Sequence, residues 1–421
     1  MPVNSRIPKL RELSVQERRS RIAEHAGADT AGFDPADGIG VEQADQMIEN
    51  AVGVFGVPLG VATNLTVNGR DYLVPMAIEE PSVVAAASNA ARMARGLGGL
   101  RASTTGPVMI AQIQIVDVPN PEAARFRVLE AREEVLARAD EQDPVLVELG
   151  GGARDLEVRA VPTASGTHLV VHLVVDVRDA MGANAVNTMA EALAPRLAEL
   201  AGGRPLLRIL SNKADRRLVR VHGEFDAELL GGERVVDDIV LASDFASADP
   251  YRAATHNKGI MNGISAVVLA TGNDTRAVEA GCHAHAARDG AYTALSRFEK
   301  NAAGNLVGTL EVPMAVGLVG GATRAHPTAR AAIRLLGVAT AVELGEVVAA
   351  VGLVQNLAAC RALAAEGIQR GHMALHARTL AVSAGAAGPE ISEVAAMMVA
   401  AGRIREEYAR QVLGELRGTP A

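Results

Sequence analysis

Four polar residues could carry chemistry: Glu80, Lys258, Asp274 and His372. Lys258 lies in "RAATHNKGIMNGI" (252–264), where amide and glycine residues flank it and the next carboxylate downstream is Asp274. Glu80 ends the apolar stretch "PMAIEE", and His372 opens "GHMALH". An ammonium group beside an apolar segment is costly unless it has a partner or a function. The four residues supply an acid, a cation, a carboxylate and an imidazole, the groups used in acid–base and electrostatic catalysis.

These residues also have structural interpretations. Glu80 precedes a helix of small residues opening at Ser82, and an acid there would favour the helix dipole. His372 and His376 would share a helix face, and "CHAH" (282–285) is another cluster. Neither cluster has the glutamate of H-E-x-x-H or a C-x-x-C partner, so we expect no metal site.

A separate stretch, "RDAMGANAVNTMAE" (178–191), has the composition of a phosphate cradle. Gly182 and Ala183 allow the backbone to approach a ligand at a helix start, and Asn184 and Asn187 offer amides. An ordinary capped helix explains the same residues. Neither G-x-G-x-x-G nor G-x-x-x-x-G-K-[ST] occurs in the chain, so a Rossmann fold or a P-loop is disfavoured.

The middle of the chain has a recognisable order of elements. Alternating apolar residues predict a strand over 108–118, and Asn120 and Pro121 predict the start of a helix over 119–141. The remaining predicted elements are a hairpin of strands at 156–161 and 167–177, a helix at 183–200 and a strand at 205–211. This order is that of a split βαβ, ferredoxin-like unit.

The whole chain is therefore predicted to be α+β, with three parts. A small ferredoxin-like unit, 107–215, is inserted into a large and mostly helical unit formed by 1–106 and 216–372. The glycine-rich break "SAGAAGPE" lies within the third part, 373–421, which is interpreted either as a helical flap or as a docked C-terminal helix.

The composition excludes several classes of function. The 421 residues carry a net charge of −8 and only 2% aromatics, which argues against nucleic-acid binding. Two cysteines imply no disulfide framework. The charged N-terminus does not look like a signal peptide, and the longest uncharged runs are too short to span a membrane. We expect a soluble, cytoplasmic enzyme.

Six stretches together resemble the 3-hydroxy-3-methylglutaryl-coenzyme A (HMG-CoA) reductases, in their soluble class II bacterial form. The stretches are "ENAVGVFGVPLGVATNLTVNGRDYLVPMAIEEPS" (49–82), "DAMGANAVN" (179–187), "ATHNKGIMNGI" (254–264), "TGNDTRAVEAG" (271–281), "VGGATRAHPTA" (319–329) and "GHMALHA" (371–377). The resemblance implies a large domain that binds acyl-CoA, a small domain that binds the dinucleotide, and a C-terminal flap. It also implies a homodimer with the active site at the subunit interface, often built into a hexamer.

The resemblance further implies roles for individual residues. The catalytic residues would be Glu80, Lys258, Asp274 and His372. The hydroxymethylglutaryl group would be held by Ser82, Arg252 and Asn262. The dinucleotide would meet Asp179, Met181, Gly182, Ala183, Asn184, Asn212 and Gln355. Asp143 lies where some members place an acid on the adenosine ribose, and a carboxylate there would repel a 2′-phosphate and favour NAD over NADP.

The chemistry of a thioester reduced twice to an alcohol suggests how these residues would work. Lys258, held by Asp274, would stabilise the negative charge that develops on oxygen. Glu80, buried among valines, would transfer the proton, and His372 would protonate the thiolate of coenzyme A. Two alternatives remain open: an acyl-CoA transferase or lyase with Lys258 as a Schiff base, and a non-catalytic ligand-binding module. The direction of the reaction, mevalonate synthesis or degradation, is also open.

Overall fold

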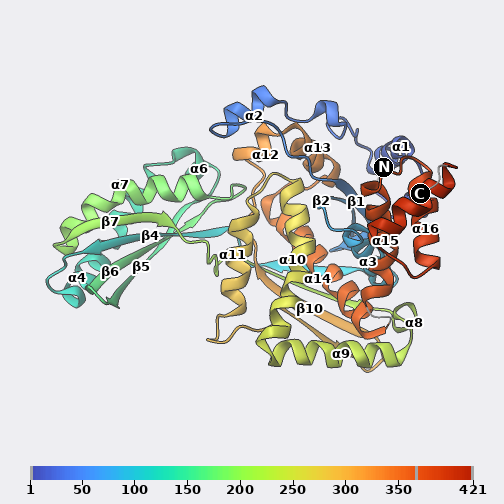
Figure 1. Ribbon diagram of the computed structural model, residues 1–421. Coiled ribbons are helices and arrows are strands. Elements are labelled where there is room, and N and C mark those ends of the chain that lie inside the picture. The colour runs from blue at the N-terminus through green and yellow to red at the C-terminus, as the bar shows by residue number, and fades with distance from the viewer. Residues whose placement is uncertain (1–2, 366–367, 419–421) are drawn as a thin grey trace.

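The computed structural model describes residues 3–365 and 368–418. Within these ranges, the chain forms a central body, a small unit on one side of it and three C-terminal helices on the other (Figure 1). Two separate sheets organise the body and the small unit.

The body is built on a six-stranded sheet, in a part of the chain where the sequence predicted mostly helices. Strands from both sides of the insertion join in it, since β3, before the insertion, pairs with β8, after it. In spatial order, the strands are β2 (Arg70–Ala77), β1 (Leu59–Val67), β3 (Leu100–Thr104), β8 (Leu218–Phe225), β10 (Leu306–Pro313) and β9 (Ser296–Lys300). Pairing across the insertion makes 1–106 and 216–365 one body with one large core.

Helices pack against this sheet and against one another. The helices of the body are α3 (Val83–Arg95), α8 (Ala227–Leu230), α9 (Glu233–Ala248), α10 (Pro250–Ala270), α11 (Thr275–Ala286), α12 (Gly321–Ala325), α13 (Pro327–Leu336) and α14 (Ala341–Ala365). Helix α14 runs through the core in contact with α10, α3 and α9. By length and composition it is the one helix of the described chain that could cross a membrane, with a mean hydropathy of 1.6, but 67% of that window is buried inside the protein.

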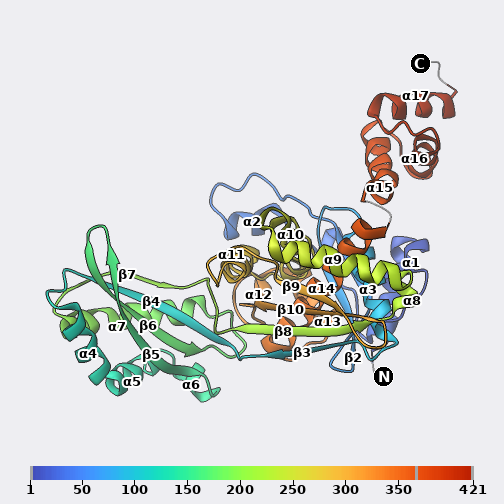
Figure 2. The ribbon, with the colours of Figure 1, turned by 90° about the horizontal axis from the view of Figure 1, so that it is seen from below.

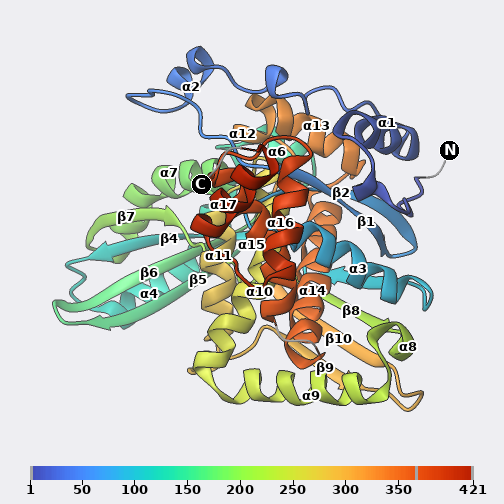
Figure 3. The same cartoon turned by 45° about the vertical axis from the view of Figure 1, so that its right-hand side comes forward.

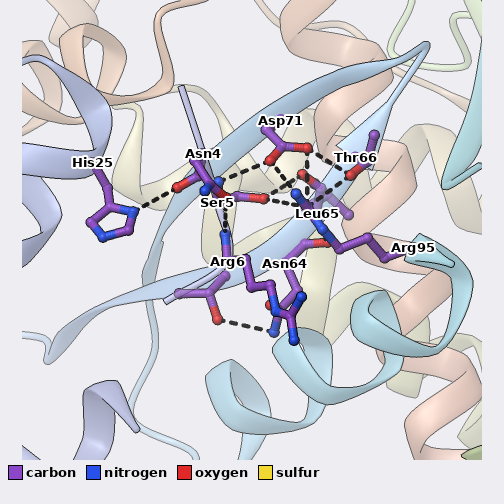
Figure 4. Close-up of polar contacts among 10 residues, drawn as sticks. Asn4, Ser5, Arg6, His25, Asn64, Leu65, Thr66, Asp71 and Arg95 are labelled. Atoms are coloured by element: carbon purple, nitrogen blue, oxygen red, sulfur yellow. Dashed lines mark hydrogen bonds and ion pairs between the residues drawn. The ribbon is translucent and has the colours of Figure 1, made fainter. Parts of the chain in front are cut away.

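The N-terminal segment is fastened to the body by hydrogen bonds between Ser5 and a partly buried ion pair. It comprises 3₁₀ turns at Leu10–Glu12 and Pro35–Asp37, and helices α1 (Val15–Ala26) and α2 (Val41–Met47). Arg95 and Asp71 pair at 2.5 Å, and Asp71 also accepts from the backbone N–H of Ser5 at 3.0 Å (Figure 4). Burial alone raises the pKa of Asp71, but these hydrogen bonds hold the pKa below its usual value.

The small unit has the predicted ferredoxin-like topology. Its elements are β4 (Val108–Val116), α4 (Pro121–Glu130), α5 (Arg132–Asp140), α6 (Pro144–Glu148), β5 (Gly152–Thr163), β6 (Gly166–Asp176), α7 (Ala183–Ala201) and β7 (Arg204–Leu210). The antiparallel sheet has the order β5-β6-β4-β7, and α4, α5 and α7 pack on it over a core of its own. The single helix expected at 119–141 is divided at Ala131 into α4 and α5.

The C-terminal helices form a third packed unit. They are α15 (Ile368–Ser383), α16 (Glu390–Ala400) and α17 (Glu406–Leu416), and they share a small core that includes Ala377, Val394 and Val412. Figure 2 shows this unit projecting from the body beyond α14, and in Figure 3 the same unit lies in front of the body. The glycine break between α15 and α16 lies where the sequence indicated one, and the region forms three helices in place of one docked helix.

Candidate active site in two halves

Lys258 and Glu80 form a short ion pair. Lys258 lies inside α10, and Glu80 lies in the turn between β2 and α3. The Lys258 Nζ and Glu80 Oε2 atoms are 2.5 Å apart, with the lysine side chain 59% exposed and the glutamate 31% exposed. Glu80 is therefore not buried among the valines of α3, as the sequence suggested; in the isolated chain its carboxylate meets a cation at the surface.

The helix that carries Lys258 is fixed by the residues beside it. Its start is capped by Asp249, whose Oδ1 accepts from the backbone N–H of Arg252 at 2.7 Å. Asn257 is buried and clamps a distant loop, accepting from the N–H of Leu295 and donating to the carbonyl of Thr293, both at 2.9 Å. The amide before Lys258 is thus a structural anchor.

His256 anchors the same turn on its buried side. Ser296 Oγ donates to Asn356 Oδ1 at 2.6 Å, so His256 Nε2, also at 2.6 Å, donates to Ser296 Oγ. Burial, together with the positive charge of Arg252, lowers the pKa of His256 to about 4. A neutral imidazole with its proton on Nε2 therefore holds α10 against β9 and α14.

Two further candidate amide side chains lie on α10 and on the helix packed against it. Asn262 is one turn beyond Lys258 on the same face of α10. At the crossing of α10 and α14, a Cβ on Gly263 would lie 2.8 Å from the Cβ of Gln355, which shows how closely these helices approach. Gln355 is 6% exposed, and its Oε1 has no hydrogen-bond partner among the described residues. This oxygen is free to accept a hydrogen bond from a ligand hydroxyl or amide, or from water.

Ser82 completes this half of the site. It is the N-cap of α3 with a φ of 75°, a left-handed conformation that is strained for a side chain other than glycine or asparagine. Its side chain makes no capping hydrogen bond to the helix. The Ser82 hydroxyl is therefore not used to cap the helix, although an N-cap serine ordinarily is.

A second cluster surrounds residues 178–184, at the junction of the small unit and the body. Gly182 is the N-cap of α7 with a φ of +106°, and a Cβ there would lie 2.8 Å from Val177 Cγ1. No side chain caps α7, so the N–H groups of its first turn are open to a ligand. Exposed Asn184 is in that turn, whereas Asn187 accepts from the N–H of Leu210 at 2.8 Å and holds β7.

Asp179 and Asp274 both act as caps in the single chain. Asp179 Oδ1 accepts from the N–H of Ala341 at 2.7 Å, at the start of α14. Asp274 is the N-cap of α11, and its Oδ1 accepts from the N–H groups of Arg276 and Ala277 at 3.0 and 3.1 Å. Among the described ion pairs, none joins Asp274 to Lys258, contrary to the expected hydrogen bond.

Asp274 is instead connected to the second cluster. Its neighbour Asn273 accepts from the N–H of Gly317 at 2.7 Å through Oδ1. A Cβ on Gly317 would lie only 2.4 Å from the backbone nitrogen of Met181, and Leu318 donates to the carbonyl of Asp179 at 2.8 Å. The segment 316–319 therefore ties the turn at Asp274 to the loop before α7.

The candidate residues thus fall into two half-sites at different ends of the helices. Lys258 is twelve residues before the end of α10, or about 18 Å along the helix axis. Gln355 is fourteen residues after Ala341, where Asp179 caps α14, or about 21 Å away along that axis. Glu80, Ser82, Asn262, Lys258 and Gln355 belong to the first half-site; the second contains Asp179, Met181, Gly182, Ala183, Asn184 and Asp274.

Comparisons with known proteins agree with this architecture. A model of the family described as hydroxymethylglutaryl-coenzyme A reductase matches residues 14–377. The chain belongs to this family. It is 56% identical over 417 residues to the 3-hydroxy-3-methylglutaryl-coenzyme A reductase of Archaeoglobus fulgidus, covering 99% of this chain and 95% of that protein.

Solved structures of the reductase extend the agreement to three dimensions. The enzyme from Streptococcus pneumoniae is similar with a TM-score of 0.83 and 40% identity, over 97% of this chain and 99% of that one. A second structure of that class II enzyme, bound to NADPH in open conformations, gives a TM-score of 0.81 and 41% identity, over 96% and 100% of the two chains. The predicted family, α+β fold and oxidoreductase class of this HMG-CoA reductase are confirmed.

Four other predicted residues of this reductase form no hydrogen bond or ion pair with either half-site in the part of the chain that the structure describes. Asp143 caps α6, accepting from the N–H of Leu146 at 3.0 Å. Asn212 has an exposed side chain, and its carbonyl lies against Gly281 of α11. Arg252 is in the first turn of α10, and its charge acts on His256. His372 belongs to α15, but its side chain is outside the part that the structure describes.

Sequence reasoning missed three residues that organise the second half-site: Arg217, Asn273 and Gly317. Arg217 is 4% exposed and donates to backbone carbonyls of the loop before α7 and of segment 316–319. Nothing in "KADRRLV" separates this arginine from its exposed neighbour Arg216. Only the topology, which places Arg217 at the junction of two units, reveals its position. Gly317 and Asn273 lie within or beside motifs but contact each other across 44 residues.

Proposed function

We propose that this reductase interconverts 3-hydroxy-3-methylglutaryl-CoA with mevalonate and free coenzyme A, using two hydride transfers. Family membership gives the reaction class. The assignment of residues to steps is argued from the two half-sites. It keeps the roles implied by the sequence, except that Gln355 moves from the dinucleotide to the acyl group.

The first half-site suits the acyl group. Lys258 is placed to stabilise negative charge on the thioester or aldehyde oxygen, and Glu80, in contact with it, to donate or accept the proton on that oxygen. Ser82, Arg252 and Asn262 would hold the hydroxymethylglutaryl group. We add Gln355 to this side, because its orphaned Oε1 lies beside α10 and can accept from a substrate hydroxyl.

The second half-site suits a nicotinamide dinucleotide, which supplies or accepts the hydride when bound. The uncapped N-terminus of α7 offers N–H groups to a pyrophosphate, and Gly182 lets the backbone approach it. Asn184 and Met181 lie on the same turn. Asp143, with Oδ1 committed to its helix cap, is proposed to meet the adenosine ribose and to favour NAD; the solved relative with NADPH makes this choice a matter for direct measurement.

The observation that carries the proposal is the separation of the two half-sites within one chain. Chemistry requires the dinucleotide and the acyl group in contact, and about 18 Å of α10 intervenes. We therefore propose a homodimer in which the first half-site of one chain meets the second half-site of its partner. Asp274 of the second chain would then hold Lys258 of the first, and the partner would cover the exposed Glu80.

An exposed apolar segment supports the presence of a second copy. Residues 48–57 connect α2 to β1 without helix or strand, and they include Val52, 99% exposed, and Phe55, 93% exposed. Fully exposed apolar side chains close together in sequence are typical of a protein–protein interface. A hexamer built from such dimers remains compatible with this proposal.

Complementation between two inactive variants tests the arrangement. Lys258→Met and Asp274→Ala chains, each inactive, are coexpressed with different affinity tags so that mixed dimers form. If each site uses Lys258 of one chain and Asp274 of the other, every mixed dimer has one intact site, and a random mixture recovers about a quarter of the wild-type rate. No recovery in purified mixed dimers would place both residues of a site in one chain.

The activity itself is tested with mevalonate and coenzyme A, with NAD and NADP compared in parallel. We expect CoA-dependent reduction of NAD, with two reduced dinucleotides per mevalonate. A preference for NADP would leave the reductase in place and remove the role of Asp143. Borohydride trapping of substrate on Lys258 without any nicotinamide requirement would favour the Schiff-base alternative instead.

The last part of the proposal concerns the C-terminal unit and the location of the protein in the cell. His372, on α15, is proposed to protonate the departing thiolate when that unit closes over the site as a flap. His372→Gln should then spare reduction of the free aldehyde intermediate, whereas Glu80→Gln should abolish it. The opposite pattern would reverse these two roles.

We also propose a cytoplasmic location, which fractionation of the source cells would test.

A further inference from the structure

Arg217 is a buried cation without a carboxylate partner. It is 4% exposed, and no ion pair of the described residues includes it. Asp176 and Asp179 act on it only at longer range, and burial lowers the pKa of the guanidinium to about 10. A buried charge is costly unless its hydrogen bonds compensate, so the partners of this guanidinium are informative.

Those hydrogen bonds converge on three carbonyl groups from two segments. Nη1 donates to the carbonyls of Ala180 and Met181, at 3.2 and 3.0 Å, and Nη2 to the carbonyl of Val316 at 2.5 Å. The planar guanidinium presents its donors in a fixed fork, so it sets the spacing and the orientation of the peptide groups it binds. Lysine, a single point charge, offers no such template.

The two segments are those that carry the second half-site. Ala180 and Met181 immediately precede Gly182, the N-cap of α7. Val316 precedes Gly317, whose N–H is bound by Asn273 beside Asp274. The Arg217 side chain therefore joins the loop proposed to bind the dinucleotide to segment 316–319, which is bound to Asn273 beside Asp274.

The backbone of Arg217 is itself fixed to the body. Its carbonyl accepts from the N–H of Met314 at 2.9 Å, and its N–H donates to the carbonyl of Ala214 at 3.0 Å, where the chain returns from the small unit to β8. The guanidinium thus holds the loop before α7 in a fixed position relative to the body of the protein.

We propose that Arg217 is a positioning residue for hydride transfer, which sets the loop at 179–184 relative to Asp274 and so governs the affinity and alignment of the nicotinamide dinucleotide. This inference rests on the proposed function of the second half-site. It assigns no contact between Arg217 and substrate; the effect passes through the peptide groups of Ala180 and Met181.

The test uses full-length Arg217→Met and Arg217→Lys, with Arg216→Met as the matched control. Arg216 is the adjacent arginine; its side chain is 43% exposed and pairs with Glu157 of the small unit. In Arg217→Met, we expect the KM for NADH to rise about tenfold and kcat to fall, with the KM for HMG-CoA within about twofold of wild type. Arg217→Lys should recover part of the loss, and Arg216→Met should resemble wild type.

Hydrogen exchange supplies a readout that does not depend on activity. Amides of 179–184 should exchange faster in Arg217→Met, while those of β4 and β6 should keep their protection. If Arg217→Met proves insoluble, Gly317→Ala disturbs the same contact from the other side, since its Cβ would press on the nitrogen of Met181, and the same change in the two KM values is expected.

Each outcome bears on a different statement. Unchanged KM values for both substrates in folded Arg217→Met, with only a lower melting temperature, would show a purely structural arginine and overturn the inference while leaving the proposed function intact. An equal rise in both KM values would also overturn it. A wild-type protein that neither binds NADH by fluorescence titration nor reduces HMG-CoA would overturn the proposed function, and the inference with it.

Discussion

Replacing Lys258 by methionine should separate catalysis from stability in this reductase. Its ammonium group is 59% exposed, so the ion pair with Glu80 is largely solvated and contributes about 1 kcal/mol or less to the free energy of unfolding. The anchors of α10, Asn257 and His256, remain in place. If Lys258 stabilises the developing oxyanion, its loss should lower kcat by about 10²–10³, or about 2.7–4 kcal/mol of activation free energy.

Lys300→Met is the matched control. Lys300, at the end of β9, pairs with Glu233 at 2.7 Å and Asp237 at 2.9 Å of α9, and its side chain is 28% exposed. Both variants are compared by steady-state NADH oxidation with HMG-CoA and by urea unfolding. We expect similar unfolding free energies for the two variants and a large loss of kcat in Lys258→Met alone. A loss of kcat below tenfold, or a stability loss in Lys258→Met of several kcal/mol, would refute the reasoning.

Three further predictions concern stability, packing and cofactor choice. His256 has a folded pKa of about 4, below its unfolded value, so the unfolded chain binds the extra proton and the free energy of unfolding falls by on the order of 3 kcal/mol as the pH is lowered from about 6.5 to 4. His256→Gln keeps a side-chain N–H donor for Ser296 and should flatten this dependence in urea unfolding measured across that pH range. Equal pH slopes in the two proteins would contradict the prediction. Gly263→Ala should lower the free energy of unfolding in urea by about 1–3 kcal/mol despite the better helix propensity of alanine, because the new Cβ would lie 2.8 Å from the Cβ of Gln355. Gly259→Ala is the control and should not lower it, since the nearest atom there is 3.7 Å away. Equal effects of the two variants would argue against close packing of α10 on α14. Asp143→Asn should preserve the α6 cap while raising the preference for NADP about tenfold, as the ratio of kcat/KM values, and an unchanged ratio would remove Asp143 as the selector.

The small unit was predictable because its signals are local. Alternation marks β4, and Pro121 marks the start of α4, although Asn120 caps that helix by position only and makes no side-chain hydrogen bond to it. The motif order also located the candidate catalytic residues. These features depend on neighbours within a few residues, which a single sequence displays directly.

The six-stranded sheet was not predictable in the same way. β3 and β8 are adjacent in space but separated by the whole inserted unit, and β1 and β3 meet at one register position, Val67 with Leu100. The burial of Arg217 and the distance between Lys258 and Asp274 likewise depend on how distant segments pack. The mechanism suggested that Asp274 holds Lys258. Within one chain, however, the helix carrying Lys258 continues for twelve residues beyond it and keeps the two apart.

The burial of α14 has a consequence for synthesis. This helix fills the centre of the body, yet it begins at Ala341, after the strands and most helices that surround it have been made. The inserted unit has its own core and is complete by residue 210, so it can fold while the body still lacks its central helix. We therefore expect nascent chains shorter than about 340 residues to expose the apolar lining of the body, where chaperones bind and aggregation begins.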